Sequence, residues 1–335
     1  MEEQKITHSL ILKNSSVPRT VFYELATSAL RALDGYEAKD GELLIPEEDT
    51  AEETNWPRFG NPSSAYIRPR FTNEPEGKIP LNIPLKTNDY IQTIADHCGK
   101  NSAKTFVIIN MNPDRRLPLA FCHRKNVIVA DGCLAGHERQ MNPKTISLPA
   151  LSMIKENILP MPGKERSIKV SFQGKLSHPC RHELMKLDNG DDIRIIGMRS
   201  PGHYGKIDAV EGIEDNFYTN LLDNSTFGIV ARGDALFSYR LLETISRGAI
   251  PIIISDGWVL PFDRTIDWNS CSLRFHQEAI NAIPFVVEKI EDARIMRLQT
   301  NSIKNYNKYL RRIELIMKTM INEAQAIKRN DQIHF

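Results

Sequence analysis

The sequence predicts an α/β protein with two domains, each built on a parallel sheet. Short apolar runs alternate with helical patterns along most of the chain, which is typical of parallel strands covered by helices. A length of 335 residues favours two hydrophobic cores over one. Residues 227–262 give the clearest unit, because they read as strand, turn, helix, glycine and strand, the order of a right-handed crossover.

The expected first domain covers residues 1–160. Apolar runs predict strands at 9–13, 105–110, 126–130 and 145–148, and helical spacing predicts helices at 17–33 and 87–97. Residues 38–77 are acidic, then rich in proline, asparagine and glycine, and are expected to form a long irregular excursion. The second half of this excursion holds Trp56 and Arg58, residue types that suit sugars and anions, although loop packing is the commoner explanation.

The expected second domain covers residues 161–298 and begins with a linker at 161–166 that contains proline and glycine. Strands are predicted at 167–172, 193–197, 227–231 and 249–254, and helices at 179–186, 213–222 and 238–247. Further helices are predicted at 276–282, 287–298 and 302–326. Residues 299–335 are expected to form a separate helical tail.

Charge, cysteine content and hydropathy exclude several classes of protein. A net charge of +1 gives no general affinity for nucleic acid. The five cysteines are scattered without a CxxC pair, so neither a disulfide framework nor a zinc site is expected. No apolar run approaches the length of a membrane span. A cytoplasmic protein without a transmembrane segment is therefore expected, with peripheral membrane contact left open.

Charged residues follow the strands of the 227–262 unit. Ligands of open parallel sheets bind beyond the carboxyl ends of the strands, which places Arg232, Gly233 and Asp256 at the expected ligand edge. The sequence contains neither GxxxxGK[ST] nor GxGxxG, so a nucleotide would be held by a helix N-terminus and arginines. An ordinary turn is the alternative explanation for Arg232 and Gly233.

The helix expected at 238–247 has two distinct faces. Leu241, Leu242 and Ile245 share one side and are expected to face the core. Arg240 and Glu243 lie on the opposite side, where Arg240 could match a diphosphate and Glu243 could accept hydrogen bonds from a ribose diol. A solvated pair of opposite charges at i and i+3 is the alternative.

The first domain supplies the candidates for general acid–base chemistry. Asp131 ends a predicted strand, and His137 and Glu138 follow at the same expected edge of the sheet. The sequence has no GxSxG motif and no cysteine in a nucleophile motif, so acyl transfer has no support. Asp131, His137 and Glu138 are therefore the candidate bases.

Residues 227–262 resemble the C-terminal signature of the exostosin-like glycosyltransferases. The matching positions are Ser238, Arg240, Glu243, Gly248, Ile250, Pro251, Ile252, Ile253, Asp256, Leu260, Pro261 and Phe262. Weaker similarity lies at 167–184, with Arg181 at the family's arginine position, and at 126–148. The resemblance covers roughly residues 126–285 and does not extend to residues 1–100, nor does the sequence show the family's N-terminal membrane anchor.

The resemblance implies a GT-B fold, in which two Rossmann-like domains face each other across a cleft. It implies transfer of a sugar, with inversion, from a nucleotide sugar, here expected to be UDP-linked, to a hydroxyl of a glycan or glycolipid in polysaccharide biosynthesis. Arg240, Glu243, Ser238, Gly233 and Asp256 would bind the donor. Arg181 and Arg232 would be secondary phosphate ligands.

No metal and no other cofactor are expected, because GT-B enzymes usually stabilise the leaving diphosphate with basic side chains and helix N-termini. The sequence also lacks a plausible Asp-x-Asp motif. Two alternatives stay open: a non-catalytic module that binds a glycan or nucleotide, and an enzyme of another reaction type, such as an epimerase, on a similar scaffold.

Overall fold

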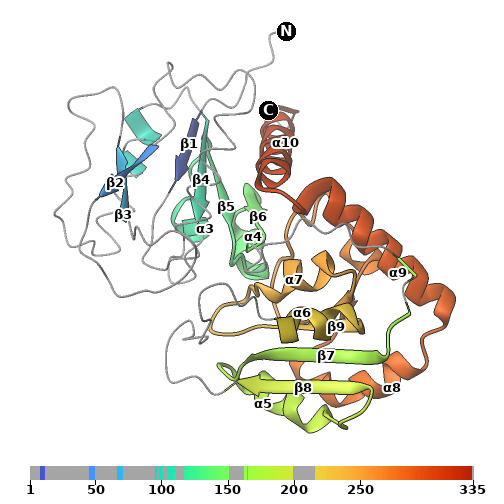
Figure 1. Ribbon diagram of the computed structural model, residues 1–335. Coiled ribbons are helices and arrows are strands. Elements are labelled where there is room, and N and C mark those ends of the chain that lie inside the picture. The colour runs from blue at the N-terminus through green and yellow to red at the C-terminus, as the bar shows by residue number, and fades with distance from the viewer. Residues whose placement is uncertain are drawn as a thin grey trace. The chain divides into compact units, whose positions relative to one another are not determined.

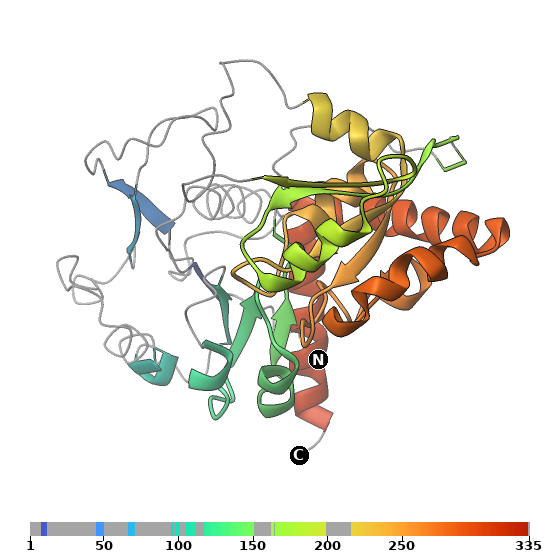
Figure 2. The same cartoon turned by 90° about the horizontal axis from the view of Figure 1, so that it is seen from below.

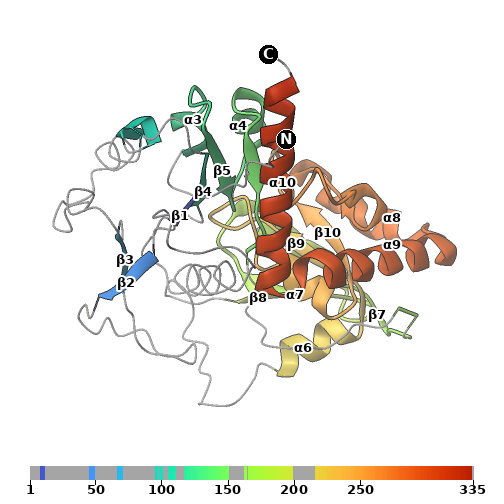
Figure 3. The ribbon, with the colours of Figure 1, turned by 90° about the horizontal axis from the view of Figure 1, so that it is seen from above.

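The computed structural model describes ten stretches of the chain, drawn in colour in Figures 1, 2 and 3. They are residues 8–11, 45–49, 66–70, 95–96, 98–100, 105–110, 117–150, 162–163, 165–198 and 216–333. The side chains of Trp56 and Arg58 and most of the helix expected at 87–97 lie outside them. None of the described helices is long and apolar enough to cross a membrane.

The chain divides into two compact units. The first contains Met1–Leu148, Val259–Thr265 and Arg312–Phe335, and the second contains Pro149–Trp258 and Ile266–Arg311. This division differs from the predicted domains, because Val259–Thr265 returns to the first unit and the expected tail at 299–335 is shared between both. Periodicity shows which face of a helix is apolar, but it does not show which core that face joins.

A four-stranded parallel sheet forms the centre of the first unit, in the order β1-β4-β5-β6. Its strands are β1 (His8–Ile11), β4 (Phe106–Asn110), β5 (Val127–Asp131) and β6 (Thr145–Ser147). The described helices of this unit include α3 (Leu117–Ala120), α4 (Gly136–Met141) and α10 (Ile313–Ile333). All four predicted strands are confirmed, and α10 runs beside β6 (Figure 3).

The predicted irregular excursion contains two strands, so that expectation is wrong in part. β2 (Ile45–Asp49) and β3 (Tyr66–Arg70) pair in antiparallel fashion as a separate small sheet. Their sequences, IPEED and YIRPR, combine proline with charged residues, which are depleted in strands. That composition explains why the pattern predicted a loop.

The second unit is built on a five-stranded parallel sheet in the order β11-β10-β9-β7-β8. The strands are β7 (Ile168–Lys175), β8 (Ile193–Met198), β9 (Ser225–Ala231), β10 (Ile250–Ile254) and β11 (Leu273–Arg274). The chain steps from β7 outward to β8 and then returns to the other side of β7 to form β9. This is the doubly wound order whose ligand crevice lies between the first and third strands.

Helices cover both faces of the second sheet (Figures 1 and 2). On one face, α5 (Pro179–Leu184) packs its Cys180 and Leu184 into the main apolar cluster. On the other face lie α6 (Asn216–Asp223) and α7 (Arg240–Ser246), which both approach Gly228 of β9. The predicted α/β class with parallel sheets is therefore confirmed.

The predicted strand–helix–strand unit is confirmed as β9, α7 and β10. Leu241, Leu242 and Ile245 are buried, as the helical spacing predicted. Gly248 ends α7 with a φ of 73°, a conformation that costs other residues energy. A Cβ on Gly228 would lie 2.6 Å from Cγ2 of Thr244, so glycine here lets α7 approach the sheet closely.

The remaining helical segments have other boundaries than the sequence pattern indicated. They are η2 (Met185–Leu187), η3 (Trp268–Ser270), η4 (Gln277–Ala282), α8 (Ile283–Glu288), α9 (Asp292–Asn305) and the π-helical turn η5 (Tyr306–Leu310). The break expected near residue 300 lies inside α9. The chain instead breaks before Asp292, where an acidic residue begins the helix and interacts favourably with its dipole.

Candidate functional site at the carboxyl edge of the second sheet

Arg181 ties the ends of β7 and β9 together at the point where the strand order reverses. Its Nε donates to the carbonyl of Arg232 at 2.8 Å, its Nη1 to that of Lys175 at 2.8 Å and its Nη2 to that of Ala231 at 2.9 Å. These bonds give the carbonyls at the ends of both strands hydrogen-bond donors. Arg181 is predicted as a phosphate ligand, but in the structure it acts as a clamp that holds the ends of β7 and β9 together at the expected ligand edge.

Gly233 fits directly against this clamp. A Cβ at this position would lie 3.0 Å from Oγ of Ser177 and 3.2 Å from Nη2 of Arg181. The predicted close approach of backbone at Gly233 is therefore an approach to Arg181 and Ser177. Beside it, Nε of Arg232 is buried and has no hydrogen-bond acceptor among the described residues.

Arg240 and Glu243 form an ion pair on the first turn of α7. Nη1 of Arg240 donates to Oε2 of Glu243, and Nε of Arg240 donates to the carbonyl of Gln173 on β7 at 2.9 Å. The Glu243 side chain is completely buried, whereas 23% of the Arg240 side chain is exposed. The alternative of a solvated pair is therefore wrong, because one partner has no contact with solvent.

Tyr218 of α6 completes this cluster and was not predicted as a site residue. Its hydroxyl donates to Oε2 of Glu243 at 3.1 Å, and its ring centroid lies 4.3 Å from Cζ of Arg240. Burial raises the pKa of Tyr218 well above its usual value, so the phenol keeps its proton and donates. Burial alone would lower the pKa of Arg240, but Glu243 and Tyr218 outweigh burial and raise it.

Ser238 and Asp256 support the backbone at this edge. Oγ of Ser238 accepts from the backbone amide of Arg240 at 3.4 Å, where α7 begins. Asp256 accepts from Nε2 of Gln277 at 2.9 Å and pairs with Nε2 of His276 at 3.1 Å. Asp256 thereby joins the end of β10 to the start of η4.

His178 caps α5 at the same edge, through Nδ1, which accepts from the backbone amide of Cys180 at 3.3 Å. Burial and the positive charges of Arg232 and Arg181 lower its pKa, so the ring is neutral at neutral pH. A pocket lies between α5 and η4. Its lining includes His178, Pro179, Cys180, Glu183, Gln277, Glu278, Ile280 and Asn281. Both polar and apolar side chains thus line a pocket beside the clamp.

The three candidate bases of the first unit have different surroundings. Asp131 is buried and accepts from Nδ2 of Asn110 and from the backbone amide of Cys133, each at 2.6 Å. Glu138 is buried and accepts from the backbone amide of Ala135 at 3.0 Å, which closes the first turn of α4. His137 is exposed on the same turn. Only His137 among the three presents its side chain to solvent.

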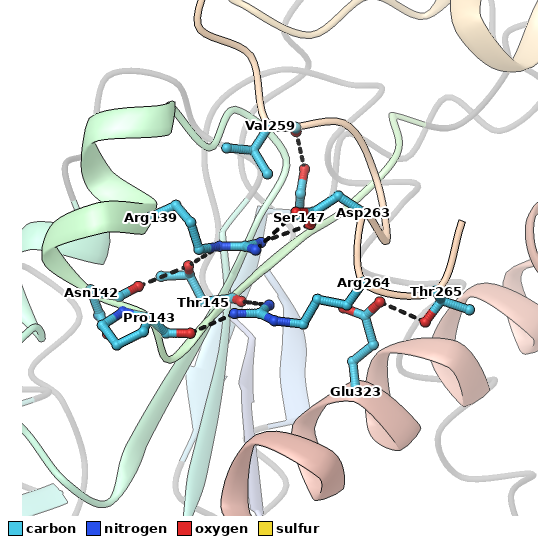
Figure 4. Close-up of polar contacts among 10 residues, drawn as sticks. All are labelled: Arg139, Asn142, Pro143, Thr145, Ser147, Val259, Asp263, Arg264, Thr265 and Glu323. Carbon is cyan, nitrogen blue, oxygen red and sulfur yellow. Dashed lines mark hydrogen bonds and ion pairs between the residues drawn. The ribbon is translucent and has the colours of Figure 1, made fainter. Parts of the chain in front are cut away.

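Arg139, one residue after Glu138, joins α4 to the returning segment Val259–Thr265 (Figure 4). It donates to both carboxylate oxygens of Asp263 at 3.0 Å and through Nε to Oγ1 of Thr145 at 2.8 Å. Oγ of Ser147 donates to the carbonyl of Val259 at 2.6 Å in the same network. These contacts, absent from the sequence prediction, hold the turn that carries His137 and Glu138.

Within the described stretches, no group of three or more histidine, cysteine, aspartate or glutamate side chains is placed to hold a metal ion. The positively charged side chains at the carboxyl edge of the second sheet include Arg181, Arg232 and Arg240. Guanidinium groups can recognise a phosphate or diphosphate through paired donors.

Comparison with known proteins gives one family. The model of the exostosin GT47 domain matches residues 107–290. The Exostosin-1 homolog of Caenorhabditis elegans is 34% identical over 164 residues, which are 45% of this chain and 43% of that protein. Exostosin-1 of Drosophila melanogaster is 32% identical over 162 residues, 45% of this chain and 21% of that protein. The chain thus spans less than half the length of these relatives.

Similar backbones also occur among solved structures. The GtfA/B complex has a TM-score of 0.40 and 11% identity, covering 70% of this chain and 55% of that chain. WaaG, a glycosyltransferase involved in lipopolysaccharide biosynthesis, has a TM-score of 0.38 and 11% identity, covering 95% and 98%. The family assignment depends on the sequence match, which extends over more than half of the 335 residues. The chain therefore belongs to the exostosin GT47 family, the exostosin-like glycosyltransferases.

Proposed function

We propose that this protein transfers a sugar from a nucleoside-diphosphate donor, bound at the carboxyl edge of the second sheet, to a hydroxyl of a glycan or glycolipid. The observation that best supports this proposal is the set of guanidinium groups at the point where the strand order of that sheet reverses. Arg240 and Arg232 would bind the diphosphate, and Arg181 would hold the two strand ends beneath it. Inversion at the transferred sugar, a UDP-linked donor and the GT-B arrangement of the two units belong to the same proposal.

Arg240 suits the diphosphate because its charge is fixed and part of its side chain reaches solvent. The guanidinium group contacts Gln173, Glu243 and Tyr218, and 23% of the Arg240 side chain stays exposed. Positive charge placed in advance stabilises a leaving diphosphate without a metal. No cofactor is therefore part of the proposal.

Glu243 has a different role in this proposal from the one its position suggested. The contact with a ribose diol stays a prediction, and it requires a movement of Arg240 or Tyr218, because Glu243 is completely buried. In the arrangement described here, Glu243 holds and neutralises Arg240. His137 is the preferred base, since Asp131 and Glu138 already accept backbone amides.

The binding of UDP tests the donor site. Arg240→Met, which keeps the length of the side chain and removes its charge, is expected to weaken UDP binding about 10- to 100-fold, the value of a charge-assisted hydrogen bond. Lys186→Met is the matched control, because the Lys186 side chain is 65% exposed and forms its ion pair with Glu183, three residues earlier. Calorimetric titration of both folded variants measures this. Equal UDP affinities in the wild type and Arg240→Met would refute the site.

A non-catalytic nucleotide-binding module is the second candidate, because Asp131 and Glu138 are occupied by backbone contacts. Release of UDP from UDP-sugars, with and without oligosaccharide acceptors, separates the two. A transferase is expected to release UDP faster with acceptor, and His137→Gln is expected to lower that rate at least tenfold. Binding of UDP without any turnover would favour the module.

A further inference from the structure

Tyr218 touches both members of the Arg240–Glu243 pair from a different helix. Its hydroxyl donates to Oε2 of Glu243 at 3.1 Å, and its ring lies against the guanidinium group of Arg240, 4.3 Å from Cζ. The residue itself is only 5% exposed. Tyr218 is therefore covered by protein, while Arg240 reaches solvent.

Three elements fix the guanidinium group of Arg240. The carbonyl of Gln173 on β7 accepts from Nε, the carboxylate of Glu243 on α7 accepts from Nη1, and the ring of Tyr218 on α6 supports the guanidinium from the side. Long arginine side chains have many rotamers, and a group that is already ordered loses less entropy when it binds a ligand. Such support is what a preorganised anion site requires.

Both contacts of Tyr218 restrict the movement of the Arg240 side chain. The hydroxyl fixes the carboxylate that holds Arg240, and the electron-rich ring face attracts the guanidinium cation. A phenylalanine would keep the ring contact and lose the hydrogen bond. A leucine would lose both.

We infer that Tyr218 is a positioning residue for the diphosphate of the donor: it orders Arg240 and does not touch the ligand. This inference rests on the proposed function, in which Arg240 binds a nucleoside diphosphate. It assigns a role to α6, a helix outside the 227–262 signature. It also distinguishes Tyr218 from an ordinary core tyrosine, which would affect stability without affecting how phosphates are recognised.

The first test compares UDP with uridine, which lacks both phosphates. Tyr218→Phe is expected to raise the Kd of UDP about three- to tenfold and to leave the Kd of uridine within about twofold. Tyr306→Phe is the control, because Tyr306 is 4% exposed in the same unit and hydrogen-bonds Ser246 on α7. That variant is expected to bind UDP like the wild type. Equal losses for UDP and uridine, or the same loss in Tyr306→Phe, would overturn the inference.

A double-mutant cycle tests whether Tyr218 acts through Arg240. In an Arg240→Met background, Tyr218→Phe is expected to have no further effect on the Kd of UDP, because the group it orders is gone. Losses that multiply independently would contradict the positioning role. Unchanged UDP affinity in Arg240→Met alone would instead refute the proposed function.

A third measurement needs no ligand and tests the ordering of Arg240 by Tyr218 separately from UDP binding. Nitrogen relaxation of the Arg240 Nε–H reports how well the guanidinium group is ordered. Tyr218→Phe is expected to increase its motion, and Tyr218→Leu, where that variant folds, to increase it further. Tyr306→Phe should leave it unchanged. Equal order in the wild type and Tyr218→Phe would overturn the inference.

Discussion

Glu323 on α10 is a buried carboxylate whose two oxygens have different surroundings. Its Oε1 accepts from Oγ1 of Thr265 at 2.7 Å, whereas its Oε2 is buried without a partner among the described residues (Figure 4). Burial raises the pKa of Glu323, against the opposing effects of Thr265 and Arg264. Ionisation of Glu323 therefore costs the folded state free energy.

The sign of this effect gives a pH-dependent prediction. A carboxyl whose pKa is higher in the folded than in the unfolded state stabilises fully below the unfolded pKa, about 4.3 for glutamate, and loses that stabilisation as pH rises through the folded pKa. Glu323→Gln keeps an acceptor for Thr265 and cannot ionise. Its free energy of unfolding is expected to rise relative to the wild type as pH increases from about 4 to 7.

Denaturant unfolding across that range measures the difference between the two proteins. Glu314→Gln on the same helix is the control, because Glu314 is half exposed and is expected to show no such trend. A difference between wild type and Glu323→Gln that stays constant with pH would contradict the prediction.

At single residues, the sequence predicts pairs within one helix better than partners from distant elements. Arg240 and Glu243 lie at i and i+3, so their contact could be predicted. Tyr218 lies 25 residues before Glu243, and only the folding of α6 beside α7 brings it there. Arg181 could be recognised as important, but its three carbonyl partners come from the ends of two strands, which periodicity does not locate in space.

Among the elements, α7 depends on the residue that ends it. Gly248 has a φ of 73°, and its carbonyl accepts from Nε2 of Gln299 on α9 at 2.8 Å. Gly248→Ala is expected to lower the free energy of unfolding by about 1–2 kcal/mol, the cost of a side chain in the left-handed region. Gly248→Asn is expected to cost clearly less, since asparagine tolerates this conformation.

Chemical denaturation of the two variants tests this explanation. Both add a Cβ, so a steric clash alone would make the larger asparagine the worse substitution. A loss in Gly248→Asn equal to or greater than that in Gly248→Ala would therefore show that the cost is not conformational.

Elements that are buried on both faces were the easiest to predict. β9 and β10 read as continuous apolar runs, and both are almost completely buried. β2 and β3 carry proline and charge, so their pairing gives no apolar signal. The helix boundaries after residue 282 were misplaced, because α8, α9 and η5 follow one another with little change in composition.

At the scale of the whole molecule, α10 belongs to the first unit, so it should matter for stability and not for donor binding. Ile316 is completely buried on this helix. Ile316→Ala is expected to lower the free energy of unfolding by about 2–4 kcal/mol, the usual cost of deleting a buried aliphatic side chain. The Kd of UDP is expected to stay within about twofold, since the proposed donor site lies in the second unit.

Ile313→Ala removes the same atoms from a half-buried position on α10 and serves as the control. It should cost less than half as much in thermal or denaturant unfolding. Equal effects at both positions would mean that α10 behaves as the independent tail that its sequence pattern suggested.

Two cores could be predicted from length and pattern, but the path of the chain between them could not. The return of Val259–Thr265 depends on contacts such as Ser147 with Val259 and Arg139 with Asp263, which join residues more than a hundred positions apart. The spacing of hydrophobic residues does not predict such contacts. The same limit explains why Asp131 could be predicted at the end of its strand, whereas α4 and the backbone bonds of Asp131 and Glu138 could not.

The divided first unit also has a consequence for the order in which the protein can fold during synthesis. β4, β5 and β6 leave the ribosome early, yet Val259–Thr265 and α10 are translated only after most of the second unit. The second unit lacks only residues 266–311 when Val259–Thr265 emerges, so it can close before the first. The unit whose strands are translated first therefore receives its last described helix, α10, only after the whole of the second unit has been translated.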